Sequence, residues 1–343
     1  MKITIKEIAD RAGVHRSTVD KVLHNRVGVS DEVRSKVQQI IDEMGYKPNP
    51  AGQILQKQGK TYKIAAILTE VDAMPFLIQG IEQGVREQTG FNIEIIYRTC
   101  KFNNSEKQCS FIDEVIAEKA DAIILSPINT DAVRKAIDRA ADAGVPVVTT
   151  NSDVPDSKRI CCIAPDGPKE SRIAGRLLGL FLGGNGKVAV VSSAVASENN
   201  NYYVHIREKG FVEFVKKEYP GIEIAEIIDS FEDVNITYKK TVELLEKHPD
   251  LRGIYITCGG ASQVGYALKE KGREREVHVI SFEDYPEIIE LIRKGVIDCT
   301  LSGEMSKQGK LPVRILMNYL VFGKTPEKEQ IHTETKILIK ENI

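Results

Sequence analysis

Short apolar runs alternate with longer amphipathic segments over most of the chain, from residue 62 onward. Each run has the length of a buried strand, and each segment between the runs repeats its apolar residues with a helical period. Strands and helices in alternation form parallel sheets with helices on both faces. Because eight or more strands are more than one such sheet usually holds, we predict an α/β fold with two doubly wound parallel-sheet lobes. The runs lie at 63–68, 93–97, 122–125, 145–150, 188–192, 222–228, 253–257 and 277–282, and the helical segments include 76–89, 105–118, 129–143 and 168–182.

Two lobes of this kind also predict where a ligand binds. Open α/β sheets bind ligands beyond the carboxyl ends of their strands, so we expect the site in a cleft between the lobes. Enzyme signatures do not accompany it, because the sequence contains no GxSxG, HExxH or GxGxxG pattern. Its six histidines show no metal-ligand spacing. We therefore expect neither catalysis nor a metal or cofactor.

The first 46 residues have a different pattern, with three short helical segments. Thr4 and Glu7 have the spacing of a capping box at the start of the first helix. Gly13 ends that helix, Ser30 is the expected N-cap of the third, and Gly45 stands where a left-handed C-terminal cap is expected. A tight glycine turn between the first two of three short helices is typical of a helix-turn-helix domain.

The outward face of the second helix, at about 15–24, carries Arg16, Ser17, Asp20 and Lys21. Such a helix can enter the major groove of DNA, where Arg and Lys side chains bond guanine. The alternative is a solvated face on a small helical domain, and the spacing alone leaves both interpretations open.

Charge distribution favours the DNA interpretation weakly. The whole chain has a formal net charge of −2, which by itself suggests no polyanionic partner. However, residues 1–60 hold 11 Lys and Arg against 7 Asp and Glu, whereas the rest holds 36 against 42. A basic segment attached to an acidic body is one sign of nucleic-acid binding.

Composition and the start of the sequence suggest the compartment. The hydrophobic fraction of 42% and charged fraction of 28% are those of an ordinary globular protein with a sizeable core. No stretch approaches about 18 consecutive apolar residues, so we predict no membrane span. The opening MKITIKEIADRAG is charged and lacks the apolar core of a signal peptide, so we expect a cytoplasmic protein. Six cysteines without a CxxC pair are expected to be buried and reduced, rather than in disulfides or a metal site.

A short segment at 47–60 separates the two regions. Asn49 can cap a helix whose first residue is Pro50. Isolated helices shorter than about 12–15 residues are marginal in water. This segment is therefore either a helix that forms when it docks on a partner, or a plain linker.

The segment ITIKEIADRAGVHRSTVDKVLHNRVGVSDEVRSKVQQIIDEMGYKPNP resembles the DNA-binding segment of the LacI (lactose repressor) family of transcriptional regulators, and the resemblance covers residues 2–58. In this family the second helix reads base edges. The hinge helix folds when two subunits meet on the operator and enters the minor groove, where a leucine wedges a base step open. The resemblance implies base reading by Arg16, Ser17 and Lys21, backbone contact or support by Thr4, Lys6, Thr18, His24, Asn25 and Ser30, and hinge contacts by Asn49, Gly52, Gln53 and Leu55, with Leu55 as the wedge.

Three residues depart from the family pattern. His15 replaces the serine usual at the start of the recognition helix, and Asp20 replaces a serine that commonly contacts phosphate. A carboxylate at position 20 should repel phosphate unless an Arg or Lys screens it. Gly52 replaces the usual alanine, which should cost the hinge helix up to about 1 kcal/mol and make its folding depend more on DNA.

Residues 61–343 resemble, more diffusely, the sugar-binding domain of periplasmic binding proteins of the ribose/galactose type, as fused in LacI-family regulators. The recognisable pieces are PVVTTNSDVPDSKR, REKGF, VISFEDYPE and LMNYLVFGKTP. The resemblance implies three crossings between the lobes, near 162–165, 282–285 and 303–305; the middle one is left open, since in the ribose-like pattern the chain stays in one lobe there. The implied organisation is a helix-turn-helix domain at 1–46, a hinge at 47–60 and an effector domain at 61–343, with lobe 1 at about 61–163 and 304–326 and lobe 2 at about 164–303 and 327–343.

Family ligand positions fall on polar and aromatic residues after the strands. Carboxylates and amides can pair with sugar hydroxyls, an arginine donates a fork of N–H groups, and an aromatic ring covers an apolar sugar face. For each of them a loop cap or a surface charge is the alternative role. The residues are Glu70, Asp72, Phe76, Asn129, Asn151, Asp153 and Asp166 on the first side, and Tyr203, Arg207, Gly259, Phe282, Glu283 and Glu304 on the second.

Two departures bear on the ligand. Cys258-Gly259-Gly260 stands where the ribose-type pattern has an asparagine, and Gly303-Glu304 stands where it has a glutamine. The loss of two amides leaves fewer hydroxyl partners and more space. We therefore expect a ligand that is larger than a simple pentose or is not a neutral sugar.

Together these features predict a transcriptional regulator, as a repressor, which binds a palindromic double-stranded DNA operator as a homodimer. A small carbohydrate-like effector in the cleft would release it from DNA. A regulator that needs its effector to bind DNA, or one that activates, remains an alternative that sequence does not decide. A solute-binding protein without DNA function is a third alternative, against which the helix-turn-helix segment argues.

Overall fold

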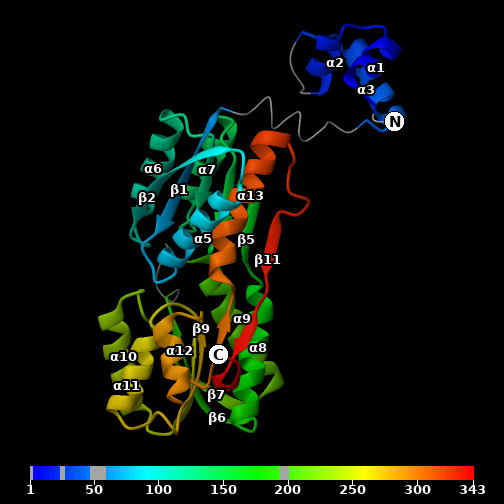
Figure 1. Cartoon of the computed structure of the whole chain (residues 1–343). Coiled ribbons are helices and arrows are strands. Elements are labelled where there is room, and N and C mark those ends of the chain that lie inside the picture. Colours follow the sequence, from blue (N-terminus) through cyan, green and yellow to red (C-terminus); the bar gives the residue numbers. More distant parts are fainter. Residues whose placement is uncertain (1–2, 24–27, 47–58, 194–200) are drawn as a thin grey trace. The chain divides into compact units, whose positions relative to one another are not determined.

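The computed structural model describes residues 3–23, 28–46, 59–193 and 201–343 (Figure 1). The chain divides into two compact units, residues 1–58 and residues 59–343, which we describe separately. The expected hinge residues Asn49, Gly52, Gln53 and Leu55, and the expected DNA contacts His24 and Asn25, lie outside the described residues.

In the described part of the N-terminal unit there are three helices, and the predicted caps are present at their ends. The Thr4 hydroxyl accepts a hydrogen bond from the backbone N–H of Glu7, and the Glu7 carboxylate accepts one from the backbone N–H of Thr4 at 2.7 Å. Gly13 at φ 69° and Gly45 at φ 62° end two of the helices in the left-handed conformation that glycine adopts without strain. The helices pack on one small apolar core and are α1 (Ile5–Ala12), α2 (Arg16–Leu23) and α3 (Asp31–Met44).

In the larger unit, the first lobe is built on a six-stranded parallel sheet with the order β11-β5-β4-β3-β1-β2. Successive residues of its central strand face opposite sides of the sheet. Ile64, Ala66 and Leu68 pack in the core that includes α5 and α13, whereas Ala65 and Ile67 pack in the core of α6 and α7. The elements are β1 (Thr61–Thr69), α5 (Met74–Glu87), β2 (Asn92–Cys100), α6 (Ser105–Ala117), β3 (Ala122–Leu125), α7 (Asp131–Asp142), β4 (Val147–Thr150), β5 (Cys161–Pro165), α13 (Met305–Phe322) and β11 (Gln330–Thr333).

The second lobe is built on a second six-stranded sheet, with the order β12-β10-β9-β8-β6-β7. Its strands are parallel except β12, which runs antiparallel to β10. Val188 and Val190 pack against α8 and α9, and Ala189 and Val191 belong to the core on the other side, with α10, α11 and α12. The elements are α8 (Gly167–Phe181), β6 (Asn185–Ser192), α9 (Tyr202–Glu218), β7 (Gly221–Asp229), α10 (Val234–Lys247), β8 (Leu251–Ile256), α11 (Ala261–Glu270), β9 (His278–Phe282), α12 (Pro286–Arg293), β10 (Cys299–Ser302), β12 (Lys336–Leu338) and the 3-10 turn η1 (Lys340–Asn342).

Two sheets of this kind confirm the predicted two-lobed α/β fold. The eight predicted apolar runs all fall in strands. Four further strands, of three to five residues each, lay outside the predicted set, at 161–165, 299–302, 330–333 and 336–338. Of the six cysteines, Cys109 is half-buried and the other five are buried.

In the described part of this unit, the chain passes between the sheets at three places: after β5, between β10 and α13, and between β11 and β12. The crossing expected near 282–285 is wrong, because β9 and β10 are parallel neighbours in the second sheet. The last crossing lies instead between Thr333 and Lys336. Residues 330–333 pair with β5 and so belong with the first lobe, not with the second as expected for 327–343.

Helix α13 returns to the first lobe because two glycines let it approach α5 closely. A Cβ atom on Gly80 would lie 2.2 Å from the carbonyl oxygen of Ser306, and one on Gly309 would lie 2.2 Å from that of Leu77. Since no side chain fits at either position, the contact fixes the start of α13, where the second crossing ends.

Candidate functional site

Helix α2 presents the side chains that the sequence analysis assigned to base reading. Arg16 and Ser17 are exposed and Lys21 is half-buried, whereas Val19 and Val22 face the core of the unit. The three polar side chains are therefore on the face away from the core. Their contacts with DNA stay a prediction.

His15 stands where the family pattern has serine, and it caps the same helix. Its Nδ1 accepts a hydrogen bond from the backbone N–H of Ser17 at 3.3 Å and lies 2.9 Å from the Ser17 hydroxyl. Its carbonyl oxygen accepts from the backbone N–H of Thr18 at 2.8 Å. The imidazole thus replaces the short polar cap with which helices usually begin.

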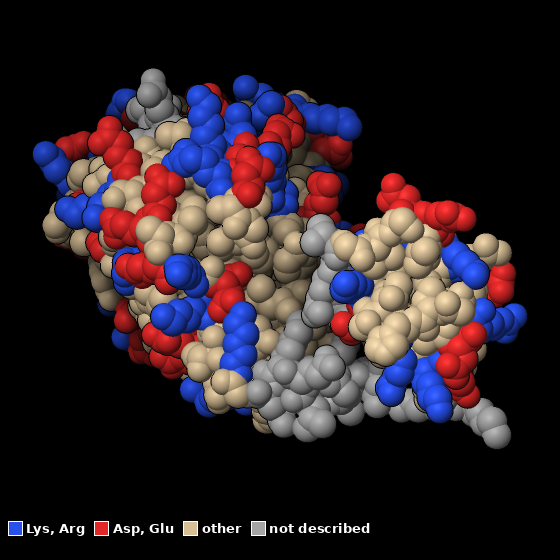
Figure 2. Space-filling view, turned by 90° about the horizontal axis from the view of Figure 1, so that it is seen from above, with Lys and Arg blue, Asp and Glu red and all other residues tan. Residues whose placement is uncertain are grey.

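The other described residues that were predicted to contact DNA lie at or near the starts of the helices. Thr4 and Lys6 are exposed near the start of α1, Thr18 is half-buried, and Ser30 caps α3 by accepting from the backbone N–H of Val33 at 3.4 Å. Figure 2 shows Lys and Arg side chains on the N-terminal unit with Asp and Glu beside them, and both signs interspersed over the larger unit. The electrostatic attraction to phosphates would therefore come from a few individual Lys and Arg side chains and not from a continuous basic surface.

A cavity lies between the two sheets of the larger unit and is lined by both lobes. Its empty space is about 590 Å³ when the open mouth is included. Its walls are mostly loops at the carboxyl ends of parallel strands, which is where open α/β sheets bind ligands. The lining residues are Val71, Asp72, Ala73, Asn151, Asn201, Val204, Arg207, Glu232, Cys258, Gly259, Gly260, Ala261, Ser262, Phe282, Glu283, Tyr285, Ile288 and Met305.

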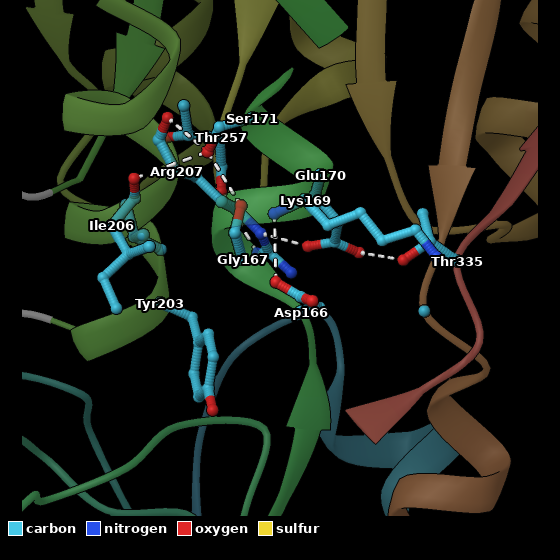
Figure 3. A network of polar contacts seen from close by, with 12 residues as sticks. Asp166, Gly167, Lys169, Glu170, Ser171, Tyr203, Ile206, Arg207, Thr257 and Thr335 are labelled. Carbon is cyan, nitrogen blue, oxygen red and sulfur yellow. Dashed lines mark hydrogen bonds and ion pairs between the residues drawn. The ribbon is translucent and has the colours of Figure 1, made fainter. Parts of the chain in front are cut away.

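At one end of the cavity Arg207 is held by a buried network (Figure 3). Its Nε donates to Glu170 Oε2 at 2.9 Å, and its Nη1 donates to the carbonyl of Thr257 at 3.4 Å. The other oxygen of Glu170 accepts from the hydroxyl of Thr335, which lies on the last crossing between the lobes. The guanidinium also stacks 3.9 Å from the ring centroid of Phe282. The charge of Arg207 is therefore already paired before any ligand enters.

At the other end, carboxyl groups converge without a cation. An oxygen of Glu232 and an oxygen of Asp72 lie 2.7 Å and 3.1 Å from the position that a Cβ atom would take on Gly259. The other Glu232 oxygen accepts from the hydroxyl of Ser193 at 2.8 Å. Burial raises the pKa of Glu232, and the Asp72 carboxylate adds to that shift.

Glu283 lines the cavity beside Arg207 and is buried. Its backbone has φ 71°, a left-handed conformation that glutamate rarely adopts. Its Oε2 has no hydrogen-bond partner among the described residues. Burial raises the pKa of this carboxyl to about 8, although the Arg207 guanidinium opposes the shift. Residues of this kind, titratable and perturbed within a cavity, are typical of functional sites.

Six of the thirteen residues predicted for the effector line this cavity. A seventh, Phe76, stacks on the lining residue Tyr285, with ring centroids 4.5 Å apart and planes at 12°. The structure brings these residues together, and their contacts with an effector stay a proposal. The six lining residues are Asp72, Asn151, Arg207, Gly259, Phe282 and Glu283.

The other six predicted residues do not line the cavity, and most have local partners. Asp153 is fully buried in an ion pair with Arg159, whose Nη2 donates to it at 2.6 Å. This pair explains why its carboxylate is not available to a ligand in the cavity. Glu70 accepts from Thr99, Asp166 caps α8, Tyr203 is buried with its hydroxyl 3.8 Å from the Cys162 sulfur, Glu304 pairs with Lys307 and Lys336, and Asn129 is half-buried after β3.

Sequence reasoning missed Glu232, Asn201, Tyr285 and the supporting Glu170. Glu232 has φ 50° in the turn after β7, and Asn201 caps α9. Both signals were present, since each residue is polar and follows a predicted strand at its carboxyl end.

In the part of the chain that the structure describes, no helix has the length and apolar character needed to cross a membrane. No group of three or more potential ligand side chains there could hold a metal ion.

Two family models match the chain. A model of the periplasmic binding protein domain matches residues 78–325, which is most of the larger unit. A model described as bacterial regulatory proteins, lacI family, matches residues 4–49 in the N-terminal unit.

Similar proteins include regulators and binding proteins. The HTH-type transcriptional regulator GalS of Salmonella typhimurium is 25% identical over 292 residues, covering 83% of this chain and 81% of that protein. The ribose operon repressor of Lactococcus lactis subsp. lactis is 28% identical over 232 residues, covering 64% and 65%. Among solved structures, GanP, a glucose-galactose binding protein from Geobacillus stearothermophilus, has a TM-score of 0.74 at 25% identity, covering 83% of this chain and 99% of that chain.

Proposed function

The chain belongs to the lacI family of bacterial regulatory proteins, with a periplasmic binding protein domain behind its DNA-binding domain, and we propose that it binds a palindromic operator as a homodimer and responds to a small carbohydrate-like effector. The observation that carries the effector half is the cavity, because both lobes contribute polar side chains to it. The named specificities of similar repressors and binding proteins, for ribose, glucose and galactose, support the carbohydrate class. As a DNA-binding regulator the protein would act in the cytoplasm.

Effector binding would act by joining the two lobes. Asp72 and Asn151 come from the first lobe, whereas Arg207, Glu232 and Glu283 come from the second. A ligand that contacts both groups stabilises the arrangement in which they are close, and so shifts the population of lobe arrangements. The crossings carry this change, since Glu170 next to the cavity accepts a hydrogen bond from Thr335 on one of them.

DNA binding would use the exposed face of α2 from two subunits. Two such helices related by a twofold axis read two half-sites, which predicts an inverted repeat in the operator. Arg16 is the leading base-reading residue, because an exposed guanidinium at the start of such a helix can bond guanine O6 and N7 together.

The test of the DNA half is a selection from random double-stranded DNA with the full chain, followed by affinity measurements on the selected sequence. We expect an inverted repeat. In Arg16→Ala, the preference over a sequence changed at one base should fall by about 1–3 kcal/mol, while binding to unrelated DNA stays similar. Lys209→Ala, at an exposed lysine of the larger unit, is the control and should keep the preference. Absence of any sequence preference in the full chain would contradict the proposal.

A further inference from the structure

Three carboxyl groups in the lining of the cavity, those of Asp72, Glu232 and Glu283, make no ion pair with any described residue. We propose, on the basis of the effector role proposed above, that the effector is a cation: a polyhydroxylated molecule with a protonated amine, of which an amino sugar is the simplest kind. The amine would lie beside Gly259, between Asp72 and Glu232. The hydroxyl groups of the ligand would face Arg207 and the amides of Asn151 and Asn201.

Two carboxylates from different lobes lie close together beside Gly259. An oxygen of Glu232 and one of Asp72 both approach the Cβ position of Gly259, at 2.7 Å and 3.1 Å, so only a residue without a side chain leaves them there undisturbed. Two carboxylate oxygens that face the same backbone position can both accept from one ammonium group beside it. Since Asp72 belongs to the first lobe and Glu232 to the second, one ammonium contacting both would also hold the lobes together.

The carboxyl groups of the cavity have few counterions. Arg207 is the one cationic side chain in the described lining, and it is already paired with Glu170, which lies outside the lining. Asp72 is exposed and makes no ion pair among the described residues. Glu232 accepts from the Ser193 hydroxyl and from the backbone N–H of Gly259, and the Arg207 guanidinium only opposes the rise in its pKa. The undescribed segment at 194–200 has the sequence AVASENN, which contains no Lys or Arg. A cation that enters the cavity would therefore be a direct counterion for these groups in their ionised form.

Glu283 supplies an independent sign that the site is incomplete. It is 8% exposed, it lines the cavity, and its Oε2 has no hydrogen-bond partner among the described residues. A buried acceptor without a partner is costly, and native proteins keep such atoms at places where a ligand supplies the donor. A hydroxyl or an ammonium of the ligand is such a donor.

Proton release on binding provides a readout of the ligand's charge. Burial raises the pKa of both Glu232 and Glu283 in the empty cavity, and the groups around them are Asp72, Asp284, Glu170 and Arg207. A cation stabilises their ionised forms, so its binding releases protons at neutral pH. A neutral polyol has no charge to stabilise them and should release few or none.

The experiment is isothermal titration of the full chain at neutral pH, in two buffers of different ionisation enthalpy, with D-glucosamine, D-galactosamine and D-mannosamine and with their parent hexoses. We expect at least one amino sugar to bind, its parent hexose to bind about tenfold or more weakly, and protons to be released. The N-acetyl form, which keeps the shape and loses the charge, should bind as weakly as the parent.

Two variants separate charge from space. Asp72→Asn keeps the shape of the site and removes one charge, and Gly259→Ala keeps both charges but adds a methyl group that must displace the Glu232 carboxylate, whose oxygen lies 2.7 Å from the Cβ position. Each variant should lower the affinity for the amino sugar about tenfold or more, and should change the affinity for the parent hexose little. Glu94→Gln, at an exposed carboxylate of β2 that does not line the cavity, is the matched control and should bind like the unaltered protein.

The outcomes distinguish this inference from the proposed function. If a parent hexose binds as tightly as its amino sugar, the cation inference is overturned and the carbohydrate effector stands. If neither group of sugars binds, both fail. The amino sugar could also bind the unaltered protein with proton release and bind Asp72→Asn and Gly259→Ala with the same affinity. In that case the amine does not lie beside Gly259, and the inference is overturned.

Discussion

The two ends of the cavity contain similar groups but differ in how those groups are paired. At one end, Arg207 and Glu170 pair with each other and with Thr257 and Thr335, so that end is complete without a ligand. By contrast, the carboxyl groups of Asp72, Glu232 and Glu283 make no ion pair among the described residues, although the Arg207 guanidinium beside Glu283 opposes the rise in its pKa. The difference suggests that the paired end fixes the geometry of the site and the unpaired end selects the ligand. Each prediction below disturbs one of these ends.

The largest effect is expected at the paired end. Glu170→Gln leaves the guanidinium of Arg207 buried without its counterion, and we expect a loss of about 3–5 kcal/mol in the free energy of unfolding of the larger unit. Thermal and urea unfolding measure it. Asp153→Asn is the matched control, since it breaks another buried pair: it should also destabilise, but leave ligand affinity unchanged. Unaltered stability in Glu170→Gln would mean that Arg207 does not depend on this partner.

A smaller, pH-dependent effect is expected at the unpaired end. The pKa of Glu283 is about 8 in the folded protein, above its ordinary value, so the folded state holds a proton that the unfolded state has released. Its contribution to stability is therefore present at low pH and is lost as pH rises to about 8, by on the order of 1 kcal/mol per pH unit at most. In the ligand-free protein, Glu283→Gln should remove this dependence. A wild type and a variant with parallel stability curves from pH 5 to 9 would contradict the assignment.

The smallest effect concerns the aromatic wall. Phe76→Leu removes the ring that stacks on Tyr285, and the expected loss of stability is about 1 kcal/mol. Tyr285 lines the cavity, so its looser placement should weaken ligand binding by a few fold. Melting temperature and ligand titration check both effects. The exposed Tyr266→Leu is the control, and an equal loss in both variants would show that the stack has no special role.

The helix ends in the described part of the N-terminal unit could be predicted one by one, because their signals are local. Thr4 with Glu7, Gly13, Ser30 and Gly45 each act within one turn of a helix, and the structure has each cap where it was expected. The α/β alternation of the larger unit was equally readable. Two crossings lie where the family resemblance implied them, near 162–165 and 303–305. The third was misplaced, because the pairing of β11 with β5 joins residues far apart in the sequence.

The cavity could be predicted only in part, because its residues come from many loops. The sequence shows which polar residues follow strands but not which way their side chains turn. Asn151 and Asp153 both follow β4; Asn151, at φ 62°, lines the cavity, whereas Asp153 is turned away and paired with Arg159. Glu232 was overlooked, because nothing in its sequence neighbourhood indicates that its carboxylate lies beside Asp72 in the folded chain.

The central claim is that the cavity and the operator are coupled, and one titration tests it directly. Operator affinity of the full chain is measured by fluorescence anisotropy with and without each of the six sugars at saturating concentration. We expect at least one sugar to change the operator dissociation constant by about 5–150-fold, which corresponds to a coupling of about 1–3 kcal/mol, and the operator to change the affinity for that sugar by the same factor. A rise in the dissociation constant would mean that the sugar releases the protein from the operator, and a fall would mean that the protein needs the sugar in order to bind. A sugar that binds in the cavity and leaves operator affinity unchanged would contradict the account.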